Sequence, residues 1–236
     1  SFQIYCDFSG YSDIAIGTSK LFGFELMSNF KFPYFSRDIG EFWRRWHISL
    51  STWFRDYLYI PFGGSKGDKW SSIRNIFIIF IVSGFWHGAN WTFMTWGLIH
   101  ALLYISFFLR GKNHRYTTTI VAENSWFPSI KEISQMGITF FSTMIAWVFF
   151  RSESVWDSYC YLLRMINEFD IPNQFRNSIL FLIMFIIYEF NLRKDERNIF
   201  MHSNALIRFS IYLLFLYLIF VKLSIINSVQ FIYFSF

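Results

Sequence analysis

One apolar stretch, from position 73 to position 109, constrains the fold of this chain more than any other feature. It is bounded by basic loops and exceeds the roughly 20 apolar residues that a membrane-spanning helix needs. Near its middle the sequence SGFWHGAN places His87 between two pairs of small residues. The stretch predicts either one long tilted helix or two helices that meet near His87, the first only about 13 residues long. Both arrangements place His87 below the membrane surface.

His87 is the leading candidate for a catalytic residue. An ionisable group inside a membrane-length apolar segment is costly and marks a functional site, although a hydrogen-bonded structural histidine is the alternative. Irregular backbone at that depth must lie against protein or a water-filled cavity. An apolar surrounding keeps an imidazole neutral, so it can accept a proton as a general base does. A hydroxyl activated in this way can attack an acyl group directly.

Composition indicates an all-α, polytopic transmembrane protein. Hydrophobic residues make up 54% of the chain and charged residues only 16%, against about 45–50% and 25% in soluble domains. The net charge of +5 is spread over short loops between apolar runs, which argues against nucleic-acid binding. The basic loop at 110–115 would lie on the cytoplasmic side. No signal peptide is visible, and residues 1–236 are interpreted as part of a single membrane domain of a longer protein.

A second candidate, His47, lies in a segment that predicts one amphipathic helix. Asp38 and Glu41 have the spacing of a capping box at its start, and Pro61 ends it. Aromatic residues share one face and polar residues the other, as in helices that lie in the membrane interface. His47 falls in the polar stripe, where a histidine needs no special explanation. Candidate substrate-binding residues on or near the two motifs are Arg44, Arg45, Arg55, Trp86 and Asn90. The three arginines could contact donor phosphates or lipid head groups. Alternatively, they only form the water-exposed face of the helix.

Other chemistries find less support. The chain has no GxSxG or HExxH motif, and Cys6 and Cys160 have no metal-type spacing, so no metal site is predicted. The glycine-rich loop at 62–69 lacks the spacing of a phosphate-binding loop. His100 is interpreted as a packing histidine with satisfied nitrogens, and His114 and His202 as loop residues without a catalytic role.

Further helices are expected around these two motifs. A membrane-entering helix is predicted at 2–24, apolar spans at 136–150, 179–190 and 206–223, and an interfacial or buried helix at 154–167.

The motifs themselves carry a family resemblance. The runs CDFSGYSDIAIGTSKLFGF, NFKFPYFSRDIGEFWRRWHISLSTWFRDYLYIPFGGSK and VSGFWHGANWTFMTWGLIHA, with AWVFFR at 146–151 and the final FIYFSF, resemble the C-terminal half of the membrane-bound O-acyltransferase (MBOAT) family. The similarity is greatest to the bacterial branch that acts in alginate O-acetylation, with D-alanyl transfer proteins more distant. The resemblance implies a many-helix membrane fold, His87 as the catalytic histidine and His47 as an assisting one.

The resemblance also implies substrates and partners. The donor would be a cytoplasmic thioester such as acetyl-CoA, with no bound cofactor. The acceptor would be a hydroxyl of a cell-surface polysaccharide or of a relay partner, and the location a bacterial inner membrane whose lipids surround the protein. Two alternatives stay open: transfer of D-alanine from a carrier protein, and a non-catalytic conduit in which His87 lines a pore or relays protons.

Overall fold

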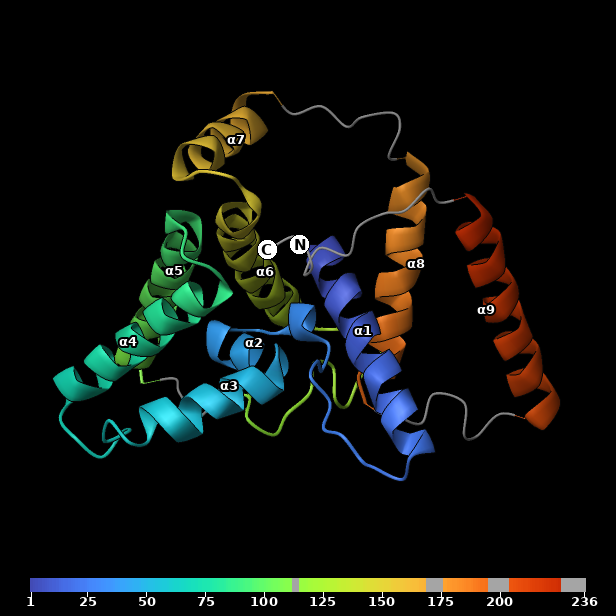
Figure 1. Ribbon diagram of the computed structural model, residues 1–236, viewed down its shortest axis with the longest axis horizontal. Coiled ribbons are helices and arrows are strands. Elements are labelled where there is room, and N and C mark those ends of the chain that lie inside the picture. Colours follow the sequence, from blue (N-terminus) through green and yellow to red (C-terminus); the bar gives the residue numbers. More distant parts are fainter. Residues whose placement is uncertain (112–114, 169–175, 195–203, 226–236) are drawn as a thin grey trace.

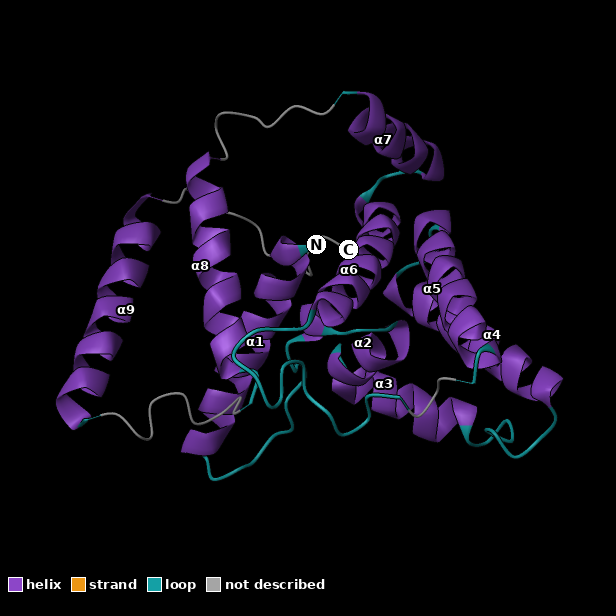
Figure 2. Ribbon diagram, turned by 180° about the vertical axis from the view of Figure 1, so that it is seen from behind, coloured by secondary structure: helices purple, strands orange, loops and turns teal. Residues whose placement is uncertain are grey.

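The computed structural model describes residues 1–111, 115–168, 176–194 and 204–225, and these parts of the chain contain helices and loops without strands (Figures 1 and 2). The α-helices are α1 (Phe2–Leu21), α2 (Ile39–Arg45), α3 (Ile48–Phe54), α4 (Lys69–His87), α5 (Trp91–Leu109), α6 (Ile130–Arg151), α7 (Val155–Asn167), α8 (Arg176–Leu192) and α9 (Ala205–Ile225). A 3₁₀ turn, η1 (Pro33–Phe35), precedes α2, and a π-helical turn, η2 (Arg55–Tyr59), follows α3. The all-α fold that composition predicts is therefore present.

The long apolar stretch forms two helices, the second of the two predicted arrangements. Helix α4 ends at His87, Gly88 adopts a φ of 156°, and α5 begins after Asn90. The expected length of the first helix is wrong, because α4 starts at Lys69 and has 19 residues. Asp68 sets this start, since its side chain accepts a hydrogen bond from the amide of Ser71 at 2.9 Å.

Two glycines allow α4 and α5 to pack closely. A Cβ atom added at Gly97 would lie 2.4 Å from the carbonyl oxygen of Phe80, and one added at Gly84 would lie 2.5 Å from that of Phe93. Neither position has room for a side chain. Small residues at such crossings are typical of helices packed in membranes, where close backbone contact replaces the hydrophobic effect as the source of stability.

Helix α6 packs on the other side of α5, and the three helices stand side by side in Figure 1. Their shared core is aromatic: Trp96 of α5 contacts Trp147 and Phe150 of α6, and α2 adds Phe42 and the following Trp46. Tilted and edge-to-face ring contacts stabilise ring pairs beyond the area that they bury. The core holds α2 and α3 against the hairpin of α4 and α5.

The prediction of one continuous helix from Asp38 to Pro61 is wrong. The helix breaks between Arg45 and Ile48, where Trp46 is extended and His47 adopts the left-handed conformation with φ 43°. A non-glycine residue pays about 1–2 kcal/mol for this conformation. The helical periodicity of the sequence continues through the break, which is why periodicity alone could not locate it.

The predicted polar face of this segment is solvated at Arg55 but not at the start of α2. Glu41 has no exposed surface and accepts hydrogen bonds from Arg37 and Arg45, with its Oε1 2.7 Å from Nη2 of Arg45. Only half of the predicted capping box forms: the Asp38 side chain accepts from the amide of Glu41, whereas the Glu41 carboxylate turns to the amide of Arg37. The Glu41 carboxylate therefore belongs to a buried ion-pair network and does not cap the helix.

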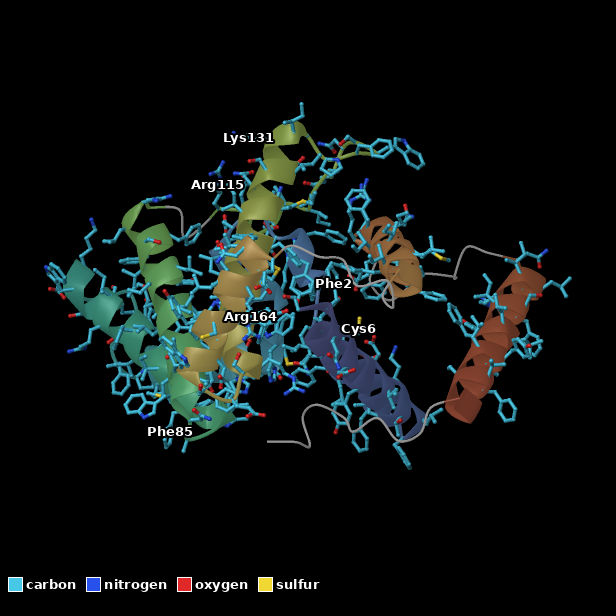
Figure 3. The ribbon with its side chains drawn as sticks, turned by 90° about the horizontal axis from the view of Figure 1, so that it is seen from above. Phe2, Cys6, Phe85, Arg115, Lys131 and Arg164 are labelled. Carbon is cyan, nitrogen blue, oxygen red and sulfur yellow. The ribbon has the colours of Figure 1, made fainter. Side chains whose placement is uncertain are left out.

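The remaining helices match the predicted segments. Among the described residues, α5 and α6 are long and apolar enough to cross a membrane, and α8 and α9 contain shorter apolar runs. Helix α1 lies beside α8 in Figure 1, where the Tyr5 hydroxyl donates to the Glu189 carboxylate. Figure 3 shows Phe85 at one end of the α4–α6 layer and Arg115 with Lys131 at the other. The turn that carries His87 therefore lies opposite the basic loop after α5.

Candidate active site

The imidazole of His87 sits in an aromatic niche at the end of α4. Its ring centroid lies 4.9 Å from Phe150 of α6, 5.3 Å from Trp96 of α5 and 4.9 Å from the neighbouring Trp86. The side chain is partly buried, so one edge of the niche stays open. Residues from three helices, α4, α5 and α6, thus form an apolar site with access for a substrate.

His47 lies at the break between α2 and α3, beside the same tryptophan. Its ring packs edge-to-face on Phe8 of α1 at 4.6 Å and lies 6.5 Å from Trp86. Its Nδ1 atom is buried and has no partner among the described residues. Helices α2 and α3 have seven residues each and are too short to span a membrane. Burial lowers the pKa of His47 and keeps the imidazole neutral.

The structure therefore brings together the two histidines that the sequence singles out. Both contact Trp86, at 4.9 Å from His87 and 6.5 Å from His47, although 40 positions separate them in the chain. His47 carries a strained backbone, and strain of this kind clusters at functional sites. The pair offers a base for a hydroxyl and a second polar side chain close to it.

A cavity of about 890 Å³ leads toward this pair from the basic end of the molecule. Tyr104 and Phe108, in the second half of α5, line its outer part, and Ser83, one helical turn before His87, lines its inner end. On the opposite wall it follows the start of α3 from Ile48 to Thr52. Ser83 and Ile48 are thus the lining residues that lie nearest in the chain to His87 and His47, and neither histidine lines the cavity itself.

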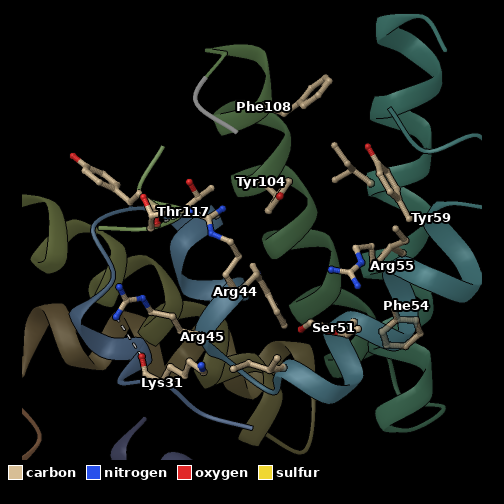
Figure 4. A pocket seen from close by; sticks show the side chains of 18 of the residues that line it. Lys31, Arg44, Arg45, Ser51, Phe54, Arg55, Tyr59, Tyr104, Phe108 and Thr117 are labelled. Carbon is tan, nitrogen blue, oxygen red and sulfur yellow. Dashed lines mark hydrogen bonds between the residues drawn. The ribbon is translucent and has the colours of Figure 1, made fainter. Parts of the chain in front are cut away.

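The lining of the cavity is basic and hydroxyl-rich. Within the described part of the chain, its charged residues are all cationic: Lys31, Arg44, Arg45, Arg55, Arg193 and Lys194. Figure 4 shows Arg44 and Arg45 on one side and Arg55 across from them. Serine, threonine and tyrosine hydroxyls surround these cations, and apolar side chains of α4 line the deeper part. Such a cavity suits a ligand with an anionic head and an apolar tail.

The three candidate arginines differ in their present partners. Arg44 donates to the carbonyl oxygen of Arg115 at 2.7 Å and has no ion pair among the described residues. Arg45 pairs with the buried Glu41, and Arg55 pairs with Asp56 at the surface, N to O 2.7 Å in both cases. Arg44 is consequently the arginine whose charge is most available to a ligand.

Trp86 and Asn90 lie near His87 but outside the cavity. Trp86 is 57% exposed, although its ring lies against both histidines. Asn90 is the N-cap of α5: its Oδ1 accepts from the amide of Thr92 at 3.1 Å, and its Nδ2 donates to the carbonyl oxygen of Glu153. A substrate-binding role for either residue stays a prediction, as does the absence of a metal site.

Three rings beside the two histidines were not predicted from the sequence. Phe150, Trp96 and Phe8 look like ordinary apolar residues, so only tertiary contact shows that the first two touch His87 and the third touches His47. His100 is fully buried, as a packing residue should be, but neither ring nitrogen has a partner within the described residues. Its packing role is therefore confirmed, whereas the predicted hydrogen-bond partners are not found among the described residues. His114 and His202 lie outside the described residues.

The fold and the site define a class of protein: a helical membrane protein in which two histidines flank one tryptophan near a basic cavity. The chain belongs to the membrane-bound O-acyltransferase (MBOAT) family, whose match extends over residues 1–147. That range includes both histidines and the whole hairpin of α4 and α5.

Several curated relatives are similar to part of this chain. A probable alginate O-acetylase AlgI of Pseudomonas syringae is 46% identical over 153 residues, which cover 65% of this chain and 27% of the relative. A peptidoglycan O-acetyltransferase of Helicobacter pylori is 42% identical, covering 66% of this chain and 28% of the relative. A teichoic acid D-alanyltransferase of Bacillus subtilis is 36% identical, covering 55% and 33%. The alignments thus span only about a quarter to a third of the length of these relatives.

Proposed function

We propose that the protein takes part in O-acyl transfer from a thioester, most simply acetyl-CoA, to a hydroxyl of a cell-surface polysaccharide or of a relay partner. The observation that carries this proposal is the placement of His87 and His47 around Trp86, with a cation-lined cavity that extends along α4 as far as Ser83. The names of the relatives, alginate O-acetylase and peptidoglycan O-acetyltransferase, support the same reaction class.

The donor enters through the cavity. Arg44, with the other cations, binds the phosphates of the donor, since guanidinium groups bind phosphate through charge-assisted hydrogen bonds. The apolar inner part accommodates the thioester arm and directs the acyl carbon past Ser83 to His87. Binding energy from the phosphates thereby positions the reacting group at a distance from them.

His87 acts as the general base. Its neutral imidazole accepts the proton of the acceptor hydroxyl while the hydroxyl oxygen attacks the thioester carbonyl carbon. The tetrahedral intermediate then loses the sulfur, and the imidazolium returns its proton to the departing thiolate. The products are an ester and a free thiol, and no covalent enzyme intermediate forms. His47 orients or polarises the reactants from the other side of Trp86.

The test uses the natural protein in its host membrane with acetyl-CoA that is radiolabelled in the acetyl group. His87→Ala should abolish transfer of label to extracytoplasmic polysaccharide at unchanged protein level, and His47→Ala should reduce it. His202→Ala, a histidine without a predicted catalytic role, is the matched control. Normal transfer by His87→Ala would overturn the general-base mechanism. Transfer from a D-alanyl carrier but not from acetyl-CoA would change the donor, and transport without consumption of a thioester would indicate a conduit.

A further inference from the structure

The break that carries His47 is held open by a segment that precedes it in the chain. Helix α3 begins at Ile48, and its first amides have no carbonyl partners within the helix. The His47 side chain makes no capping hydrogen bond. The main-chain oxygen of Asn29 accepts from the amide of Ile48 at 3.0 Å, and the Asn29 Oδ1 accepts from the amide of Ser49 at 3.1 Å. Asn29 thus supplies the cap that His47 does not.

The same segment also satisfies the other side of the break. The amide of Lys31 donates to the carbonyl oxygen of Arg45, the last residue of α2, at 3.0 Å. Residues 29–31 therefore pair with the end of one helix and the start of the next. Without these bonds the polar groups exposed by the break would lack partners, and the strained conformation of His47 would lose its support.

Helix α1 anchors this arrangement from behind. The side-chain nitrogen Nδ2 of Asn29 donates to the hydroxyl oxygen of Ser12 at 3.4 Å, and Ser12 is buried. Phe8, one helical turn earlier on the same face of α1, packs on the His47 ring. One helix face thus touches both the histidine and the residue that holds its backbone.

We propose that Asn29 is a positioning residue for His47: it fixes the helix break that aims the imidazole at Trp86 and His87. The inference rests on the proposed function where it concerns turnover, but its geometric part does not. Asparagine suits the position because a short side chain must accept from Ser49 and donate to Ser12 at once. Aspartate keeps the acceptor alone, and alanine keeps neither.

The first experiment measures geometry without catalysis. Membranes that hold the natural protein are treated with diethylpyrocarbonate, and modification of each histidine is read by mass spectrometry. Asn29→Ala should raise the modification rate of His47 several-fold and leave that of His87 unchanged, while Asn29→Asp should stay near wild type. Ser12→Ala is the control on the α1 side and should have a smaller effect. Equal rates for His47 in Asn29→Ala and wild type would overturn the proposal.

The second experiment is a double-mutant cycle on acyl transfer. Asn29→Ala should lower the turnover number about tenfold with little change in the donor KM, the effect of losing a cap worth about 1.4 kcal/mol. Asn29→Asp should restore most of the rate. In a His47→Ala background the further loss should vanish, because both residues act through one group.

The outcomes separate the two proposals. An equal loss from Asn29→Ala in both backgrounds would show that Asn29 acts on general stability and would overturn its positioning role. If His87→Ala transferred label normally, the proposed function would fail instead, and the labelling result for His47 would still decide whether Asn29 holds the break. If Asn29→Ala failed to accumulate, Asn29→Gln, which moves the side-chain acceptor away from Ser49 by one methylene, would carry both measurements, and a wild-type modification rate of His47 in that variant would overturn the proposal.

Discussion

The indole of Trp96 packs edge-on against the imidazole of His87, with ring centroids 5.3 Å apart and planes at 89°. The same indole lies 5.0 Å from the His100 ring. Trp96 therefore contacts both a partly exposed histidine and a fully buried one. Because Trp147 and Phe150 of α6 also pack on it, the position of Trp96 depends on the packing of α5 against α6.

The first prediction concerns the contribution of His100 to stability. Both of its nitrogens are buried without partners in the described part of the chain, and an unsatisfied buried polar group costs about 1–3 kcal/mol. His100→Phe should therefore leave the thermal midpoint in detergent unchanged or raise it. A clear fall in the midpoint would mean that the nitrogens do have partners, such as internal water. Phe42→His, which would place a polar ring in the same core, is the matched variant and should destabilise.

Gly97 makes a second prediction, on the crossing of α4 and α5. Gly97→Ala should destabilise the protein by about 1–3 kcal/mol, since the new Cβ would lie 2.4 Å from the backbone oxygen of Phe80. Gly137→Ala in α6 is the control, because nothing lies within 4 Å of its added Cβ. The control should be stabilising by about 0.5–1 kcal/mol. Thermal unfolding of both variants in one detergent checks the difference, and equal midpoints would contradict the close crossing.

Glu41 makes a third prediction, on the buried ion pairs of α2. Glu41→Gln should cost about 3–5 kcal/mol, because Arg45 would keep its charge in a largely buried site without a carboxylate, and Arg37 would keep only Glu132 as its partner. Asp56→Asn breaks the surface pair with Arg55 and should change stability little, since water screens exposed charges. Denaturation midpoints of the two variants measure the contrast. A loss that is similar for both would show that the Glu41 site is hydrated.

Arg44 makes a fourth prediction, which depends on the proposed function. Arg44→Gln should raise the KM for acetyl-CoA about three- to tenfold with little change in the turnover number, because the arginine binds phosphate far from the reacting carbon. The wild-type KM should rise with salt, and the variant should respond less. Lys69→Gln, a lysine at the start of α4 outside the cavity, is the charge-matched control. A loss of turnover without a KM change would place Arg44 in a structural role.

Much of the fold could be predicted from the sequence because it depends on local physical chemistry. Long apolar runs form helices wherever membrane or protein surrounds them, and the small residues around His87 mark the turn between α4 and α5. Gly88 shows the cause directly, since its φ of 156° is one that side chains rarely adopt. His87 was identifiable because a titratable residue stands out within an apolar run.

The environment of His47 could not be predicted in the same way. The local periodicity from Glu41 onward fits one amphipathic helix, and no residue within it signals a break at Trp46 and His47. The break depends on hydrogen bonds from Asn29, which lies 18 positions earlier in the chain. Likewise, the spacing of the polar stripe is that of a solvent-facing surface, and only the tertiary structure shows that Glu41 within it is buried.

The sequence by itself determined the class of the chain: a helical membrane protein of the MBOAT family with His87 in an apolar turn. Those properties follow from composition, residue spacing and motifs, which can be read from the sequence without knowing which segments touch. Only the tertiary structure decided that His87 and His47 flank one tryptophan, that six cations converge on one cavity, and that Asn29 caps a helix it does not adjoin. The physical reason is that these contacts join residues whose spacing along the chain has no fixed relation to their distance in space.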